Sequence, residues 1–146
     1  MMDMSSSDTF PKTNESFFLN KEKVRRFSQD GYLLLSSFFT TKQIESCLDK
    51  IRKYIDETVP LIPSEETFYE VKNDHTTLKQ LQRMHIHEPW FDILFNGKTK
   101  QLAETLLDGE VITKNLQYFN KPPKIGKATP PHQDGYYFKL TPPKAL

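Results

Sequence analysis

The sequence contains a single cysteine, Cys47, among its 146 residues. One thiol cannot build an internal disulfide framework or a cysteine-rich zinc site, which excludes the small disulfide-stabilised domains of secreted proteins. No apolar run approaches the roughly 20 residues that cross a bilayer. The acidic, serine-rich start MMDMSSSDTF lacks the apolar centre of a secretory signal, and the chain does not end in an SKL-type signal. These absences predict a soluble protein of a reducing, cytoplasmic compartment, without a membrane partner.

An excess of charge of either sign is also lacking. The chain has 20 Lys and Arg against 19 Asp and Glu, which leaves a net charge of +1. Proteins that bind nucleic acid through its phosphates need a strongly basic surface, so this balance argues against a nucleic-acid partner. Hydrophobic residues make up only 36% of the chain, but 11 phenylalanines, six tyrosines and one tryptophan each bury a large area. The length predicts one domain.

The amino-terminal third contains the first recognisable elements. Residues 1–19 are polar and show no apolar period, so we predict a flexible leader followed by one domain over residues 20–146. At the start of this domain the pattern predicts a short helix over 21–29 with Gly31 as its carboxyl-terminal cap. The compact apolar run at 32–35 is typical of a buried strand.

The most regular segment comes next. Thr40 and Gln43 have the spacing of a capping box, in which each side chain bonds the other residue's backbone. The helix that begins there should end near Glu57, before Pro60. Its apolar face is predicted to comprise Ile44, Leu48, Ile51 and Ile55, with Cys47 and Tyr54 beside them.

Helical patterns dominate the middle of the chain, and strand patterns dominate its end. The expected elements are a short strand over 68–71, a segment at 78–87 that fits helix or strand, helices over 89–95 and 98–107, a strand over 111–119, and an aromatic strand over 132–138. Helices first and strands last favour an α+β fold. Only 12 residues follow Asp134. Since two or three strands cannot close a barrel, we expect the sequence to stop as a β-domain begins.

His132-Gln133-Asp134 is the main candidate for chemistry. On an extended segment, residues two apart point to the same face, so the imidazole of His132 and the carboxylate of Asp134 can converge on one cation. Nitrogen and oxygen ligands on one face are typical of the 2-His-1-carboxylate triad that holds non-heme Fe(II). The spacing is equally consistent with a surface strand in which the His and the Asp only share a hydrogen bond.

Three other features have simpler interpretations. His85 and His87 have the spacing of a two-histidine metal pair on a strand, but no nearby cysteine or carboxylate supports it, and a polar edge is favoured. Cys47 lies near the apolar face of a helix, which favours a packing role. The lysines of the loop 121–127 surround a lone glycine without the spacing of a phosphate-binding loop, so a solvated turn is predicted.

Two longer segments carry a resemblance to a known family. The stretch QYFNKPPKIGKATPPHQDGYYF closely resembles the phytanoyl-CoA dioxygenase family, and the opening FSQDGYLLLSSFFTTKQIESCLDKI is similar to that family's amino-terminal segment. The resemblance implies a jelly-roll, cupin-like double-stranded β-helix, whose first strands pack against amino-terminal helices. It also implies an oxygenase that uses Fe(II), 2-oxoglutarate as cosubstrate and dioxygen, with ascorbate as a possible further requirement.

The resemblance assigns four residues. It implies that His132 is the first iron-binding histidine and that Asp134 is the iron-binding carboxylate. It places Gln117 on a strand that touches 2-oxoglutarate and Lys79 near a lysine that reaches the same cosubstrate. From the residues alone, Gln117 is also consistent with a solvent-facing strand amide, and Lys79 with a solvated surface lysine. The family's second iron-binding histidine and its cosubstrate-binding arginine have no matched residue, since the last arginine is Arg83.

These expectations define a function and its alternatives. The resemblance implies hydroxylation of a small-molecule or acyl-CoA substrate. Without the distal histidine and arginine, we expect the chain alone to be inactive. Open sheet edges that carry aromatic residues also predict self-association. The alternatives are a non-catalytic binding or interaction module of the same fold and a partial gene model.

Overall fold

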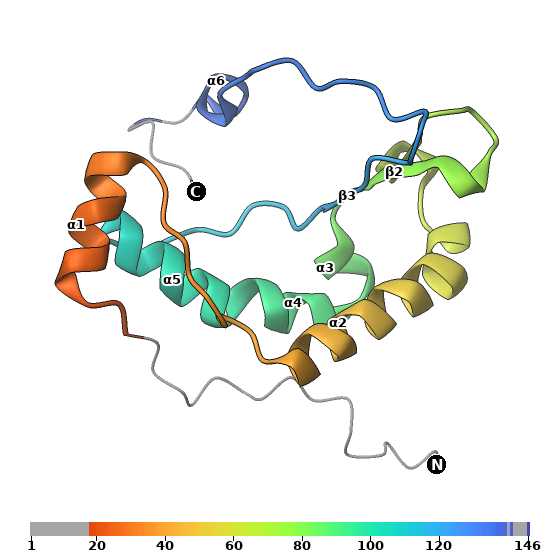
Figure 1. Ribbon diagram of the computed structural model, residues 1–146. Helices are drawn as coiled ribbons and strands as arrows, with labels where there is room; N and C mark the ends of the chain where they lie inside the picture. Colours follow the sequence, from red (N-terminus) through yellow and green to blue (C-terminus); the bar gives the residue numbers. More distant parts are fainter. Residues whose placement is uncertain (1–17, 140, 142–145) are drawn as a thin grey trace, which may run out of the picture.

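A computed structural model of the chain describes residues 18–139, 141 and 146. The predicted leader therefore lies almost wholly outside the described residues, and the domain boundary at residue 20 stays a prediction. The helices form one layer and a small sheet lies at one end of it, while the segment after the sheet arches back over the helices (Figure 1). The elements, in chain order, are α1 (Lys21–Asp30), α2 (Thr41–Lys53), β1 (Thr67–Tyr69), β2 (Leu78–Leu81), α3 (Met84–His87), α4 (Pro89–Asn96), α5 (Lys98–Leu107), β3 (Tyr118–Phe119) and α6 (Asp134–Phe138).

Local capping explains where the first two helices begin and end. The predicted capping box at the start of α2 is confirmed: the Gln43 N–H donates to the Thr40 hydroxyl at 3.2 Å, and the Thr40 N–H donates to Gln43 Oε1 at 2.9 Å. Gly31 ends α1 in the left-handed region at φ +76°, where its N–H donates to the Phe27 carbonyl. After Lys53, α2 continues as a π-helical turn over Tyr54–Thr58, which agrees with the predicted end near Glu57.

The hydrophobic core lies where α2, α4 and the sheet meet. The rings of Tyr54 and Phe91 pack edge to face with their centroids 5.3 Å apart. Leu81 from β2 is fully buried beside them. On the predicted apolar face of α2, Ile51 packs against this core, whereas Ile44 and Leu48 are each 45% exposed. The buried hydrophobic residues are Tyr54, Val59, Leu78, Leu81, Met84, Trp90 and Phe91.

The sheet is antiparallel with the order β1-β2-β3. In β2, Gln80 pairs with Phe68 on one side and with Phe119 on the other. The ambiguous segment 78–87 turns out to hold both structures, because Arg83, at φ +53°, separates β2 from α3. The predicted strand over 111–119 shrinks to the two residues of β3.

Two predicted strands are wrong. The run 32–35 forms no strand, and its side chains Tyr32 and Leu34 are 71% and 83% exposed. The segment 132–138 does not form a strand either, because α6 begins within it at Asp134. A lone extended segment leaves its backbone groups without a neighbouring strand, whereas a helical turn satisfies some of them locally. In α6 the Lys139 N–H bonds the Gly135 carbonyl in this way.

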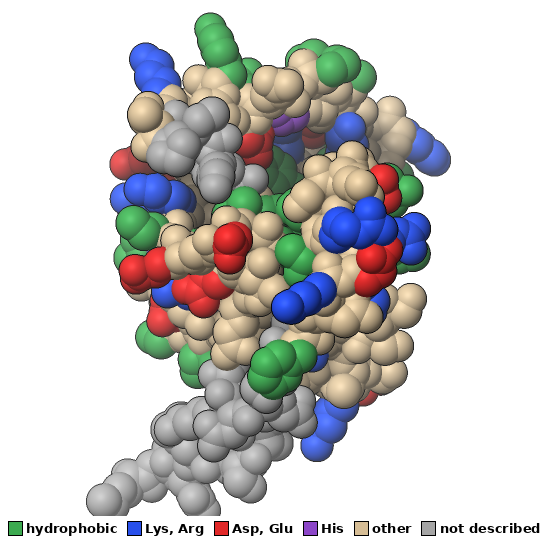
Figure 2. Space-filling model, turned by 90° about the vertical axis from the view of Figure 1, so that its left-hand side faces the viewer, with side chains coloured by type: hydrophobic (Ala, Val, Ile, Leu, Met, Phe, Trp, Pro, Cys, Tyr) green, Lys and Arg blue, Asp and Glu red, His purple; other side chains and the backbone are tan. Residues whose placement is uncertain are grey.

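These elements make a mixed fold of helices and a small antiparallel sheet, which confirms the α+β prediction. The three short strands show no jelly-roll within the described residues. No described helix combines the length and the apolarity needed to span a membrane. Figure 2 shows hydrophobic side chains exposed on one face, scattered among charged groups of both signs.

Candidate functional site

The first candidate pair, His132 and Asp134, lies at the start of α6. His132 lies in the loop before the helix, Gln133 is extended, and Asp134 is the first helical residue. The prediction that they share a face of a strand is therefore wrong, but the turn into the helix still brings the side chains together. His132 Nε2 lies 3.4 Å from Asp134 Oδ1, and His132 Nδ1 lies 3.0 Å from the Pro130 carbonyl.

The contact of His132 Nδ1 with the Pro130 carbonyl fixes which ring nitrogen carries a proton. A carbonyl oxygen only accepts hydrogen bonds, so Nδ1 carries the proton and donates it to Pro130. In the neutral ring, the lone pair of Nε2 then points at the Asp134 carboxylate. A backbone carbonyl that holds the other ring nitrogen is also the usual support of a metal-binding histidine.

Two acceptors that face each other favour a cation or a proton between them. Cis ligands at about 2.1 Å from a metal ion lie about 3.0 Å apart, close to the separation of Nε2 and Oδ1 in His132 and Asp134. The nitrogen–oxygen donor set also matches the preference of Fe(II). These two side chains therefore fit a divalent metal ion, and a protonated imidazole paired with the carboxylate is the other arrangement they allow. Across the described ranges, no third His, Cys, Asp or Glu joins them in a metal-binding group.

The second candidate pair, Lys79 and Gln117, lies at the sheet. Gln117, just before β3, accepts a hydrogen bond on Oε1 from Gln80 Nε2 at 2.6 Å, so its amide is not simply solvated. Lys79 Nζ lies 3.4 Å from Glu70 Oε1, and the Glu70 side chain is only 5% exposed. The Lys79 side chain is 44% exposed, and the buried carboxylate of Glu70 holds its ammonium group. Lys79 thus comes from β2 and Gln117 from the residue just before the adjacent strand β3, and each has a defined partner.

The structure does not join the two pairs directly. The arch 120–133 separates β3 from α6 (Figure 1). Among the described residues, no hydrogen bond or ion pair connects His132 or Asp134 with Lys79 or Gln117. One contact does tie the arch to the sheet: the Lys127 N–H donates to Glu70 Oε1 at 3.4 Å. The carboxylate that holds Lys79 therefore also holds the segment that leads to His132.

Comparison with known proteins assigns the family. The family model described as phytanoyl-CoA dioxygenase (PhyH) matches residues 27–146. The chain belongs to this family. No curated protein and no solved structure matches the chain. Phytanoyl-CoA dioxygenase membership places the protein among oxygenases that in general use Fe(II) and 2-oxoglutarate, and it confirms the resemblance in the HQD-containing and amino-terminal segments.

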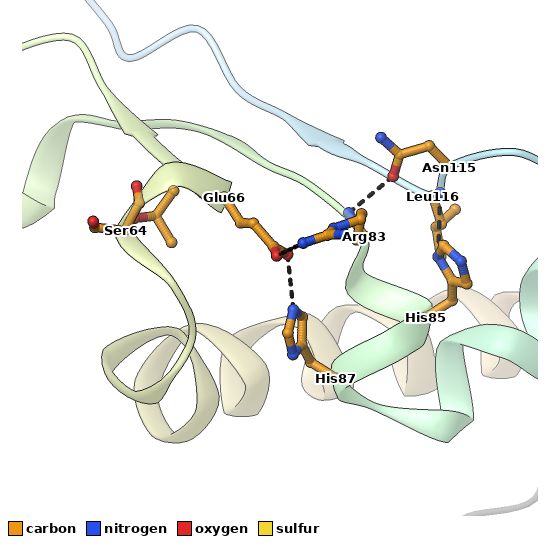
Figure 3. A network of polar contacts seen from close by, with 8 residues as sticks. Ser64, Glu66, Arg83, His85, His87, Asn115 and Leu116 are labelled. Carbon is orange, nitrogen blue, oxygen red and sulfur yellow. Dashed lines mark hydrogen bonds and ion pairs between the residues drawn. The ribbon is translucent and has the colours of Figure 1, made fainter.

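Among the residues that the structure describes in this phytanoyl-CoA dioxygenase family member, the most buried charge lies outside both candidate pairs. The side chain of Glu66 is 3% exposed and contacts Arg83 and His87 (Figure 3). His87 Nε2 lies 2.8 Å from Glu66 Oε2 and donates to it, since a carboxylate accepts. Hydrogen bonds and charge attraction from Arg83 and His87 outweigh burial and lower the pKa of Glu66. Sequence reasoning missed this residue.

The helix α3 that carries His87 also shows how His85 and His87 are oriented relative to each other. His85 and His87 are two apart on α3, so they point in different directions rather than to one cation. His85 Nδ1 accepts the Leu116 N–H at 3.4 Å, and Asn115 Oδ1 accepts the Arg83 N–H at 2.8 Å (Figure 3). These bonds attach the segment before β3, and hence Gln117, to α3.

Two further groups of this phytanoyl-CoA dioxygenase family member, Cys47 and Tyr54, lie in or against the hydrophobic core. Burial raises the pKa of the Cys47 thiol, which packs against the core as predicted. Tyr54 has a buried hydroxyl without a hydrogen-bond partner among the described residues. Burial and the nearby carboxylates Glu66 and Glu88 raise the pKa of Tyr54 to about 12. Neither group is thus poised to ionise near neutral pH.

Proposed function

We propose that this protein takes part in Fe(II)- and 2-oxoglutarate-dependent hydroxylation of a small-molecule or acyl-CoA substrate. In this proposal His132 and Asp134 are two of the iron ligands. The observation that carries it is the 3.4 Å separation of His132 Nε2 and Asp134 Oδ1, with His132 Nδ1 held by the Pro130 carbonyl. We further propose that β1, β2 and β3 are early strands of a double-stranded β-helix.

The chain's own residues have distinct tasks in this proposal. His132 and Asp134 hold the metal, and the bound iron supplies the activation of dioxygen. The ammonium of Lys79 and the amide N–H groups of Gln117 bind carboxylates of the cosubstrate, because both are hydrogen-bond donors. Glu70 keeps Lys79 in place until a carboxylate competes for it.

Metal titration tests this proposal without a substrate. Co(II) should bind the chain, and His132→Ala and Asp134→Ala should each weaken that binding by at least about tenfold, because loss of a supporting group alone costs about that much. The spectroscopic signal of Co(II) measures the affinity. The matched control is His75→Ala, since His75 contacts the Tyr69 hydroxyl far along the chain from the pair. Equal affinity for the wild-type chain and His132→Ala would contradict the assignment.

A further inference from the structure

The orientation of one side-chain amide suggests an unassigned role for Gln80. Gln117 Oε1 accepts a hydrogen bond from Gln80 Nε2 at 2.6 Å, and both residues are half-buried. A primary amide carries its oxygen and its NH₂ group on opposite sides of one carbon. A partner that holds the oxygen therefore turns the NH₂ group away from itself, toward whatever lies on the other side.

This orientation matters for a dicarboxylate. Ionised carboxylates only accept hydrogen bonds, so Gln117 can bind one through its NH₂ group but not through its oxygen. We propose that Gln80 is a positioning residue that fixes the Gln117 amide with its NH₂ group toward a carboxylate of 2-oxoglutarate. The inference rests on the proposed function, because it takes Gln117 as a cosubstrate contact.

The backbone around both glutamines is already fixed. Gln80 lies in the central strand and pairs with Phe68 and Phe119 on its two sides. The segment of Gln117 is anchored to α3 by the Met84 N–H, which donates to the Leu116 carbonyl at 3.2 Å. The Asn120 N–H also donates to the Lys79 carbonyl at 2.8 Å. The main remaining freedom is rotation of the two side chains, and their shared hydrogen bond removes it.

Calorimetric titration of 2-oxoglutarate into the Co(II)-loaded full chain tests this role. Gln80→Met keeps the length of the side chain and removes the donor, so it should weaken 2-oxoglutarate binding about threefold to tenfold, the range of one hydrogen bond. Affinity for Co(II) alone should not change. Gln80→Glu should weaken cosubstrate binding further, because a carboxylate at position 80 accepts the NH₂ group of Gln117. Gln82→Met makes the same replacement two residues away and should bind as the wild type does.

A double variant separates positioning from a general structural effect. If Gln80 acts through Gln117, then Gln80→Met should have no further effect on cosubstrate affinity in a Gln117→Met background. A second, additive loss in the double variant would overturn the proposal. So would a Gln80→Met variant that binds 2-oxoglutarate as tightly as the wild type while Gln117→Met binds it weakly, and that result would leave the proposed function intact. Absence of metal-dependent 2-oxoglutarate binding in the wild type would overturn both.

Discussion

At the scale of single residues, Glu66 is the most constrained charge among the described residues. Its carboxylate is almost fully buried, and burial of an unpaired charge costs several kcal/mol, roughly. Arg83, at the N-cap of the short helix α3, and His87, its last residue, offset this cost. Because the backbone of Arg83 also binds Asn115, the carboxylate helps to fix the segment that leads to Gln117.

The lowered pKa of Glu66 makes stability depend on pH. A carboxyl whose folded pKa lies below its unfolded value stabilises the fold above the unfolded pKa, and this contribution is lost as the pH falls through the folded pKa. Glu66→Gln should lower the free energy of unfolding at pH 7 by about 1–3 kcal/mol, the cost of losing charged hydrogen bonds. The loss relative to the wild type should shrink as the pH falls below about 4. Urea unfolding across this range measures both effects.

The exposed neighbour Glu65 provides the control for this prediction. Glu65→Gln makes the same replacement one residue away and should change the free energy of unfolding by less than about 0.5 kcal/mol. Wild-type and Glu66→Gln profiles that run parallel between pH 3 and pH 7 would contradict the role of the Glu66 charge.

Sequence reasoning predicts which polar side chains meet only where local spacing carries the signal. His132 and Asp134 are two residues apart, so either a turn or an extended backbone can bring their side chains together. Their proximity was therefore predictable, although the strand predicted to hold them was wrong. Glu66 meets Arg83 and His87 across 17 and 21 residues, and Gln80 meets Gln117 across 37. No period or motif encodes these long-range contacts.

At the scale of elements, local signals predicted α1, α2, α4 and α5 well, whereas the predicted strands were only partly right. The helix α5 ends at Leu107, as predicted, because Asp108 adopts φ +54° after it. Helical hydrogen bonds close within four residues, so capping residues and turn residues determine the limits of a helix. A strand needs a partner elsewhere in the chain. The apolar run 32–35 and the aromatic segment 132–138 have strand-like composition but no such partner among the described residues.

The capping box of α2 offers a test at this scale. Thr40→Ala removes the oxygen that accepts the Gln43 N–H, so it should lower the free energy of unfolding by about 1 kcal/mol. Thr41→Ala replaces the same residue type one position later, inside the helix, and should have little effect. Chemical denaturation followed by circular dichroism measures both variants. A loss at Thr41 as large as that at Thr40 would contradict the capping assignment.

At the scale of the whole molecule, the core and the proposed cosubstrate site share one strand. In β2 the buried side chains Leu78 and Leu81 flank Lys79 and Gln80. The positions of the two polar side chains therefore depend on how well the leucines pack in the hydrophobic core. Substitutions that disturb the packing of the core should therefore also displace Lys79 and Gln80 at the proposed cosubstrate site.

Phe91, only 1% exposed, gives the sharpest test of where that core lies. Phe91→Ala removes a ring that packs against Tyr54 and Trp90, and the resulting cavity should lower the free energy of unfolding by about 3–5 kcal/mol. That is a large part of the roughly 5–15 kcal/mol that stabilises a typical domain. Phe119→Ala is the matched control, since Phe119 is 68% exposed and its loss should cost less than about 1 kcal/mol. Urea unfolding curves measure both, and equal losses for the two variants would contradict a core centred on α4.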